Sequence, residues 1–202
     1  MSGAKAQDPV RKATDCPVSI DTRKSAVARA AMDAGANLIN DVAALTYDTG
    51  MASFVAQCDA PVCLMHAKGD PATMQDDPHY DNVLLDVYDF LAARIDACVA
   101  AGITRDRIVV DPGIGFGKTL AHNIALLRGL PLFHGLGCPI LLGASRKRFI
   151  GTLADAPDAA DRMAGSVAVA LQGVAAGVQF LRVHDIKETR QAVCLQMAVT
   201  EQ

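Results

Sequence analysis

The sequence predicts an α/β fold of the (β/α)8-barrel family, present here as an incomplete barrel of about six parallel strand–helix units. Short apolar segments alternate with longer alanine-rich segments, a pattern typical of a parallel sheet with helical crossovers. Almost every apolar segment ends in a polar or charged residue. A barrel gathers side chains from all its strand ends, whereas a doubly wound sheet gathers them at one switch point, so the sequence favours a barrel. Eight units normally need ~250 residues, and only about six can be found.

The predicted strands are short and rich in aliphatic and β-branched residues, as expected of buried parallel strands. They cover residues 17–22, 37–43, 61–66, 108–111, 139–145 and 180–185, and their polar ends are Asp21, Asn40, His66, Asp111, Ser145 and Arg182. The strand that begins at Ile108 is the clearest. It ends at Asp111, and the three spaced glycines that follow let the chain turn sharply and approach a flat ligand.

The predicted helices fill the intervals between the strands. They cover residues 23–34, 48–58, 82–101, 121–130 and 159–176, and a last helix starts near Lys187. Glycines follow several of these helices, which is a common way for a helix to end. The polar segment 67–81 is unusually long for a connection and is expected to be functional. Residues 1–14 are polar and patternless, so we expect a disordered N-terminal segment before one domain over residues 15–202.

Composition excludes several classes of protein. The chain is 51% hydrophobic, enough for one full core, and its net charge of -3 with no lysine- or arginine-rich run argues against nucleic-acid binding. No apolar run approaches the ~20 residues that span a bilayer, and the N-terminus lacks the apolar core of a signal peptide. The six cysteines are scattered without a CxxC pair, so we expect free thiols in a reduced, cytoplasmic protein.

The glycine-rich stretch after Asp111 matches neither common nucleotide motif. Three residues separate Gly113 from Gly117, where a P-loop needs four. Lys118 occupies the position where a dinucleotide fingerprint needs its third glycine. The stretch is therefore a tight connection between a strand and a helix, with an acid at its start.

Asp21, Asn40 and Asp111 lie at three strand ends and share one face of a barrel. Two carboxylates and an amide can form the in-plane hydrogen bonds of an amino-heterocycle such as a pterin. Each residue could instead cap a helix or turn, and metal ligation is a further alternative. The residues alone leave these readings open.

A second group of residues suggests an anion site. Ser145, Arg146 and Lys147 follow one predicted strand, and Arg182 and His184 lie two apart on another, where strand periodicity points them the same way. Cationic and donor groups together suit phosphate, although a surface salt bridge of Arg182 is the simpler alternative. His66 could belong to the site, but a core histidine with its hydrogen bonds satisfied explains it equally well.

Taken together, these segments resemble dihydropteroate synthase, of the pterin-binding barrel superfamily. The resemblance rests on Ser19–Thr22, Ile39–Val42, Met65 and His66 with Gly69, Pro71, Met74 and Gln75, Asp111–Lys118, Gly143–Lys147 and Arg182–Asp185. These segments occur in the family's order and at its normal spacing, from about Cys16 to the last helix. The resemblance implies folate biosynthesis, in which 6-hydroxymethyl-7,8-dihydropterin diphosphate condenses with 4-aminobenzoate to give 7,8-dihydropteroate and pyrophosphate.

The resemblance also implies a role for individual residues. The pterin would be held by Asp21, Asn40, Met65, Asp111, Phe116, Gly143 and Lys147. The 4-aminobenzoate site, where sulfonamides compete, would be bordered by Ser145, Phe116 and Lys147, and the diphosphate would be bound by Arg182 and His184. Lys147 and Asp111 would be the catalytic residues, and Mg²⁺ would assist.

The sequence departs from the resemblance at its front, where family members carry two more strand–helix units. One of these supplies an asparagine that binds the metal and the other a loop over the aminobenzoate; neither is found before Pro17. We therefore expect no metal ligand in this chain, impaired activity, and an open sheet with edges at residues 17–21 and 180–185 that self-associates. Family members commonly dimerise through helices near the C-terminal end. The alternatives are a non-catalytic pterin-binding remnant and a pterin-dependent methyltransferase barrel.

Overall fold

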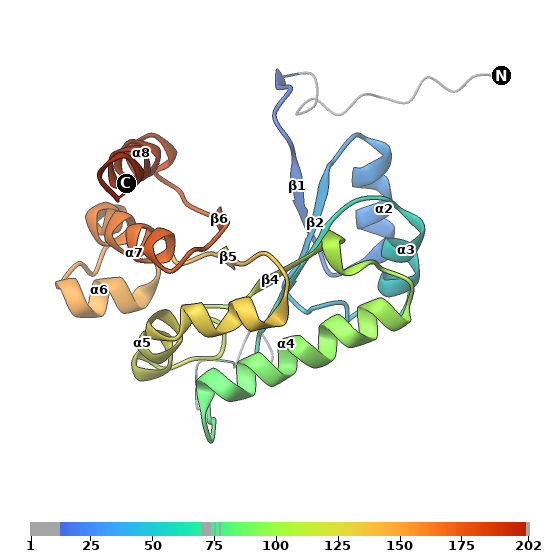
Figure 1. Ribbon diagram of the computed structural model, residues 1–202, viewed down its shortest axis with the longest axis horizontal. Helices are drawn as coiled ribbons and strands as arrows, with labels where there is room; N and C mark the ends of the chain where they lie inside the picture. Colours follow the sequence, from blue (N-terminus) through green and yellow to red (C-terminus); the bar gives the residue numbers. More distant parts are fainter. Residues whose placement is uncertain (1–12, 70–73, 75, 77, 201–202) are drawn as a thin grey trace.

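In the computed structural model, which describes residues 13–69, 74, 76 and 78–200, strands and helices alternate along the chain as the sequence predicts (Figure 1). Almost all of the segment 1–14, expected to be disordered, lies outside the described residues, as does part of the long loop 67–81. Within the described residues, no helix combines the length and the apolarity needed to cross a bilayer.

Four strands form a parallel sheet in the order β1-β2-β3-β4: β1 (Ser19–Asp21), β2 (Leu38–Asp41), β3 (Val62–Met65) and β4 (Ile108–Asp111). The last two strands, β5 (Leu141–Leu142) and β6 (Phe180–Leu181), form a second parallel pair, which a bridge between Val110 and Ile140 connects to β4. The register places Asp21 opposite Asn40 and Met65 opposite Asp111. The polar ends predicted from sequence therefore meet at one edge of the sheet.

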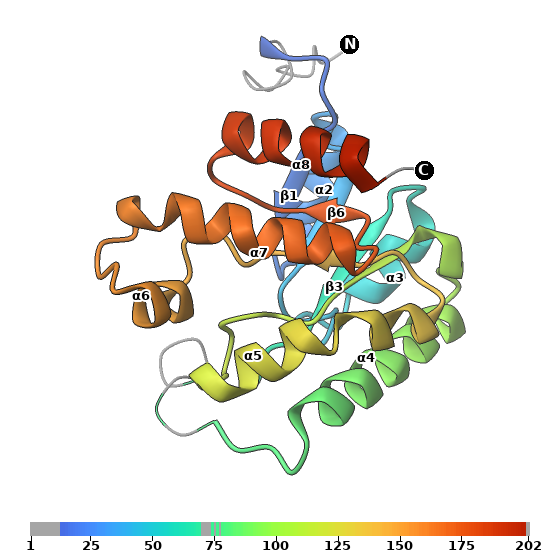
Figure 2. The ribbon, with the colours of Figure 1, turned by 60° about the vertical axis from the view of Figure 1, so that its left-hand side comes forward.

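Helices cover the outer face of these strands (Figures 1 and 2). They are α2 (Ser25–Asp33), α3 (Met51–Gln57), α4 (Val83–Ala100), α5 (Leu120–Arg128), α6 (Arg148–Ala154), α7 (Met163–Ala175) and α8 (Ile186–Thr200). The 3-10 segments Arg105–Arg107 and Leu130–Leu136 lie between a helix and the next strand, and Ala160–Arg162 joins α6 to α7. In α4, Val87, Leu91 and Ile95 recur at helical spacing and are fully buried, so this face packs against the sheet.

Three predictions about the C-terminal half were wrong. The strands predicted over residues 139–145 and 180–185 are only two residues long in each case. Arg182 and His184 therefore follow the strand instead of lying on it, and alternation along a strand cannot orient them. Helix α6 was missed, because Gly151 and three basic residues near its start obscure the apolar period.

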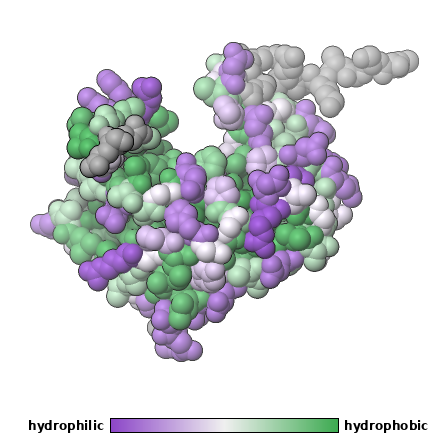
Figure 3. Space-filling model, in the orientation of Figure 1, coloured by the Kyte–Doolittle hydropathy of each residue, from purple (hydrophilic) through white to green (hydrophobic). Residues whose placement is uncertain are grey.

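The expected open sheet is confirmed for the part of the chain that the structure describes, where no strand pairs with the outer edge of β1 or of β6. The surface is hollowed between α8 and the N-terminal strand (Figure 3). An ion pair nevertheless links the two open ends, with 2.7 Å between Arg182 Nη2 and Asp21 Oδ2. On α8, the side chains of Ile186, Leu195 and Val199 are exposed and remain uncovered in the monomer.

Candidate functional site

Asp111 lies at the centre of the strand ends, as predicted from the sequence. It closes β4 and is only 5% exposed. Its Oδ1 accepts a hydrogen bond of 2.7 Å from the backbone N–H of Gly113. Burial raises the pKa of Asp111, while the positive charges of Lys147, Lys118 and Arg182 act in the opposite direction. A buried carboxylate surrounded by cations but bonded to one backbone N–H still has acceptor capacity for a ligand.

The glycines after Asp111 are required by the close approach of another loop. Gly113 has a φ of 69°, and a Cβ on it would lie 1.8 Å from the carbonyl oxygen of His66. Gly117 has a φ of 62°, and its Cβ would lie 2.2 Å from the carbonyl oxygen of Lys68. Both positions need glycine for conformation and for space. The loop after β4 is therefore packed directly on the chain that follows β3.

Asn40 and Asp21 form the second polar group of the site. Asn40 Nδ2 donates to Asp21 Oδ1 over 2.6 Å, so the two side chains lie in contact as expected. The other carboxylate oxygen of Asp21 pairs with Arg182. Among the buried side-chain atoms of the described residues, Asn40 Oδ1 is one of three without a hydrogen-bond partner. A buried acceptor without a donor is costly, and in a cleft it indicates where a ligand donor binds.

Lys147 brings positive charge between these groups and Phe116. Its Nζ lies 4.4 Å from the centre of the Phe116 ring and donates to the carbonyl oxygen of Ile114. Burial lowers the pKa of Lys147 to about 8, against the opposing influence of the Asp111 carboxylate. Gly143 lies beside the same carboxylate, where a Cβ would be 3.5 Å from Asp111 Oδ2. Lys147, Phe116, Gly143 and Asp111 are thus brought together as the sequence predicted.

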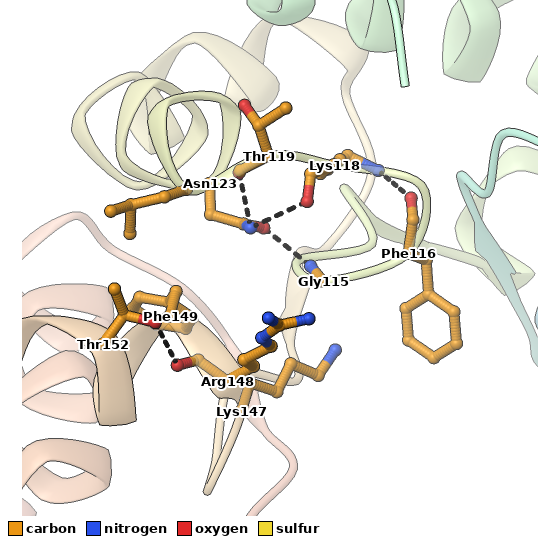
Figure 4. A pocket seen from close by; sticks show the side chains of 10 residues that line it. Gly115, Phe116, Lys118, Thr119, Asn123, Lys147, Arg148, Phe149 and Thr152 are labelled. Carbon is orange, nitrogen blue, oxygen red and sulfur yellow. Dashed lines mark hydrogen bonds between the residues drawn. The ribbon is translucent and has the colours of Figure 1, made fainter. Parts of the chain in front are cut away.

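A pocket of about 530 Å³ opens next to this group (Figure 4). It is lined by Gly115, Phe116, Lys118, Thr119, Leu120, Asn123, Lys147, Arg148, Phe149 and Thr152. The end of the Lys147 side chain points toward the Phe116 ring at one side of this pocket (Figure 4). Among the described residues that line the pocket there are basic and aromatic side chains and no carboxylate, so it suits a flat anionic molecule.

Lys118 is a buried lysine that sequence reasoning did not assign to the site. It is 4% exposed, and its Nζ lies 2.9 Å from His66 Nδ1 and 3.0 Å from the carbonyl oxygen of Phe116. Burial lowers its pKa to about 7, and burial with the charge of Lys118 lowers the pKa of His66 to about 3. His66 is therefore a neutral core histidine with a satisfied ring nitrogen, which was one of its two readings. Only its place at the end of the segment Asp111–Lys118, on which the resemblance partly rests, could have drawn attention to Lys118.

Ser145 and His184 meet at the far side of the site. Ser145 Oγ lies 3.0 Å from His184 Nδ1 and accepts the backbone N–H of His184 over 3.2 Å. Arg182 is more than half exposed and paired with Asp21, which is the salt bridge considered as an alternative to the anion site. Met65, at the end of β3, is buried beside the register position of Asp111. All the residues expected to form the site thus lie along one edge of the sheet.

Metal binding has no support from side-chain geometry. Across residues 13–69, 74, 76 and 78–200, no three His, Cys, Asp or Glu side chains gather closely enough to hold an ion. Within these described residues, the side chains alone do not supply the oxygen ligands that a Mg²⁺ ion needs.

Comparison of the sequence with known proteins relates this chain to pterin-binding enzymes. A family model described as "Pterin binding enzyme" matches residues 7–184. Dihydropteroate synthase of Neisseria meningitidis serogroup B is 48% identical over 181 residues, which cover 88% of this chain and 64% of the relative. The enzyme of Escherichia coli K12 is 42% identical over 176 residues, covering 87% of this chain and 62% of that protein. The chain thus spans less than two thirds of the length of these relatives.

Solved structures agree with the sequence comparison. Yersinia pestis dihydropteroate synthase in a sulfonamide complex superposes with a TM-score of 0.91 at 42% identity, covering 95% of this chain and 69% of that one. Xanthomonas albilineans dihydropteroate synthase in complex with 7,8-dihydropteroate gives a TM-score of 0.89 at 44% identity, covering 96% and 72%. The predicted TIM-barrel class is therefore confirmed, with the units present here arranged as in those enzymes.

Proposed function

Because the chain belongs to the family of pterin-binding enzymes, we propose that it carries the pterin, aminobenzoate and diphosphate subsites of a dihydropteroate synthase. The reaction would condense 6-hydroxymethyl-7,8-dihydropterin diphosphate with 4-aminobenzoate. The observation that carries the proposal is the unpaired Asn40 Oδ1, buried at a strand end on a side chain that bonds to the Asp21 carboxylate. A pterin ring presents amino and ring N–H donors in one plane, and such a donor is what Asn40 Oδ1 lacks.

The pterin would lie across the strand ends. Asn40 Oδ1 and the Asp111 carboxylate accept hydrogen bonds from its amino and ring N–H groups, while Lys147 donates to its oxygen or ring nitrogen. Met65 and Gly143 border the ring from the sheet. Burial strengthens each of these hydrogen bonds, because little water competes in the pocket.

The aminobenzoate would enter through the pocket beside Phe116 and Lys147, with Ser145 nearby. Its amine nitrogen forms a bond to the methylene carbon of the pterin as the carbon–oxygen bond to diphosphate breaks. The electron pair of the broken bond goes to the diphosphate oxygen, and the amine loses its proton to water. Arg182 and His184 would stabilise the negative charge that develops on the leaving group.

The ion pair between Arg182 and Asp21 is compatible with this role. Both side chains are more than half exposed, so the pair contributes little to stability. Arg182 can therefore leave Asp21 for a diphosphate at a small cost in free energy. A diphosphate offers the guanidinium more negative charge than one carboxylate. A methyltransferase is disfavoured, because the basic groups that follow β5 and β6 suit a diphosphate that such enzymes do not handle.

We also propose a homodimer in the cytoplasm as the working state. The groove between α7 and α8 has a volume of about 420 Å³ and is lined by Met163, Ala164, Val167, Glu188, Gln191, Ala192 and Leu195. Leu195 and Val199 extend this apolar surface on α8. A second copy would cover these side chains and remove them from water. The cysteines of the described chain are free thiols, as a reduced compartment would keep them.

Calorimetric titration with 6-hydroxymethylpterin tests the pterin subsite. Asp111→Asn keeps the shape of the side chain and an acceptor for Gly113 but removes the charge. We expect pterin affinity to fall between about 10-fold and 100-fold, because a hydrogen bond to a charged group contributes about 1.5–3 kcal/mol. The matched control is Asp96→Asn, at an exposed carboxylate of α4 that pairs with Arg105 over 3.6 Å.

Each outcome of this titration has a definite meaning. Equal pterin affinity in the wild type and in Asp111→Asn would remove Asp111 from the subsite. If the folded wild-type chain did not bind pterin at all, the proposed function would be wrong. A comparable loss in Asp96→Asn would mean that the effect reflects overall charge and not the site.

A further inference from the structure

Two loops of the site are held together by an ion pair between Arg146 and Asp185. The guanidinium of Arg146, after β5, makes a two-pronged contact with the carboxylate of Asp185, just before α8. Its Nε lies 3.0 Å from Asp185 Oδ2, and Nη2 donates to Oδ1. Arg146 lies between Ser145 and Lys147, and Asp185 follows His184. This contact thus joins the segment that carries Lys147 to the segment that carries Arg182 and His184.

Arg146 has an unfavourable backbone conformation for its residue type. Its φ is 57°, in the left-handed region where glycine or asparagine is the usual choice. Two hydrogen bonds hold the backbone there: its N–H donates to Ser166 Oγ over 2.8 Å, and its carbonyl accepts from Arg162 Nη1 over 3.0 Å. An arginine at such a position implies that its side chain makes a contact that glycine could not provide.

The side chain of Arg146 is already committed to Asp185. Two of its three guanidinium nitrogens bond to the carboxylate, whose side chain is only 13% exposed. The hydrogen bond from Arg146 lowers the pKa of Asp185, so the acid stays ionised at neutral pH. Arg146 is therefore better placed to hold Asp185 than to bind a substrate anion itself.

We propose that Arg146 is a positioning residue of the diphosphate subsite. Through Asp185 it fixes the start of α8, and with it the place of His184, whose ring meets Ser145 on the neighbouring segment. This inference rests on the proposed function, since the subsite it serves is the one formed by Arg182 and His184. A guanidinium is required because only its planar fork holds both carboxylate oxygens at once.

Asp185→Asn provides the sharpest test, with inorganic pyrophosphate as the probe in a calorimetric titration. Removing a negative charge next to an anion site strengthens anion binding if only electrostatic attraction matters. Positioning through Arg146 predicts the opposite, because an amide cannot accept both prongs and His184 loses its alignment. We expect pyrophosphate affinity to fall about tenfold, as displaced binding groups commonly cause losses of this order or more.

Arg146→Lys is the companion variant, because it keeps the positive charge and loses the fork. It should weaken pyrophosphate binding by a similar factor, while the affinity for 6-hydroxymethylpterin stays within about threefold of the wild type. If Asp185→Asn alone does not fold, Arg146→Lys decides the question. Asp96→Asn, which removes an exposed carboxylate of α4, is the matched control and should leave pyrophosphate affinity unchanged.

The ring nitrogens of His184 give a readout that does not depend on pyrophosphate binding. In the wild type we expect nitrogen NMR to show Nδ1 as an acceptor from Ser145 and the proton on Nε2, a signature that both variants lose. Unchanged pyrophosphate affinity and an unchanged His184 signature in folded variants would overturn the role of Arg146. The wild type could fail to bind pyrophosphate and still show the His184 signature, with the variants losing that signature. This result would contradict the diphosphate subsite but support the role of Arg146 in positioning His184.

Discussion

Lys118→Met should make the folded chain more stable relative to the wild type as the pH is lowered. The lysine is 4% exposed, and its pKa falls from 10.5 to about 7 because burial disfavours its charged form. Methionine has a similar length and carries no charge. In the unfolded chain Lys118 binds a proton up to about pH 10.5, whereas in the folded chain it loses that proton above about pH 7.

The sign follows from the number of bound protons. Between the two pKa values the unfolded state holds one more proton than the folded state, so the stability due to Lys118 rises with pH and falls as the pH drops. The slope is about 1.4 kcal/mol per pH unit. From pH 8 to pH 9.5 the wild type should therefore gain about 2 kcal/mol in free energy of unfolding relative to Lys118→Met. Titrating groups that do not interact with Lys118 are common to both proteins and cancel in the difference.

Urea denaturation of both proteins at the two pH values measures this change. The exposed Lys187 of α8 provides the control, because water reaches it in the folded and the unfolded chain, and Lys187→Met should give the same difference from the wild type at both pH values. A difference between the wild type and Lys118→Met that does not vary with pH would refute the burial of a titrating amine. Lys118 lines the pocket and fixes Phe116 through its carbonyl, so we interpret its destabilising burial as serving the site.

Two further predictions concern the pocket wall and the surface of α8. Phe116→Ala should weaken 4-aminobenzoate binding about tenfold in a fluorescence titration, because the lost aromatic contacts face the pocket; an unchanged aminobenzoate affinity would exclude Phe116 from that wall. Leu195→Glu should shift the mass measured by light scattering from dimer to monomer, because it places a charge in the apolar groove between α7 and α8; a dimer that persists would place the interface elsewhere.

Much of the fold could be predicted because its signals are local. A run of β-branched apolar residues such as Ile108 to Val110 favours a buried parallel strand, and Asp111 then lies at the end of that strand. The same reasoning placed Asp21 and Asn40 at neighbouring strand ends, and they are in contact. Strand lengths were less predictable. Strands β5 and β6 are each only two residues long. Their length depends on which partner strands are available, and the local sequence carries no signal for that.

The sequence by itself determined the class of fold and which polar residues lie at the ends of the first four strands, because strand periodicity and glycine-rich turns are properties of neighbouring residues. Only the tertiary structure decided which charges meet. The pairing of Asp21 with Arg182 joins residues from opposite ends of the chain, and the burial of Lys118 depends on the loop after β3 that packs over it. The left-handed turn at Arg146 is equally hidden, because an arginine gives no local signal for it; contacts with Ser166, Arg162 and Asp185 impose that conformation from other segments of the fold.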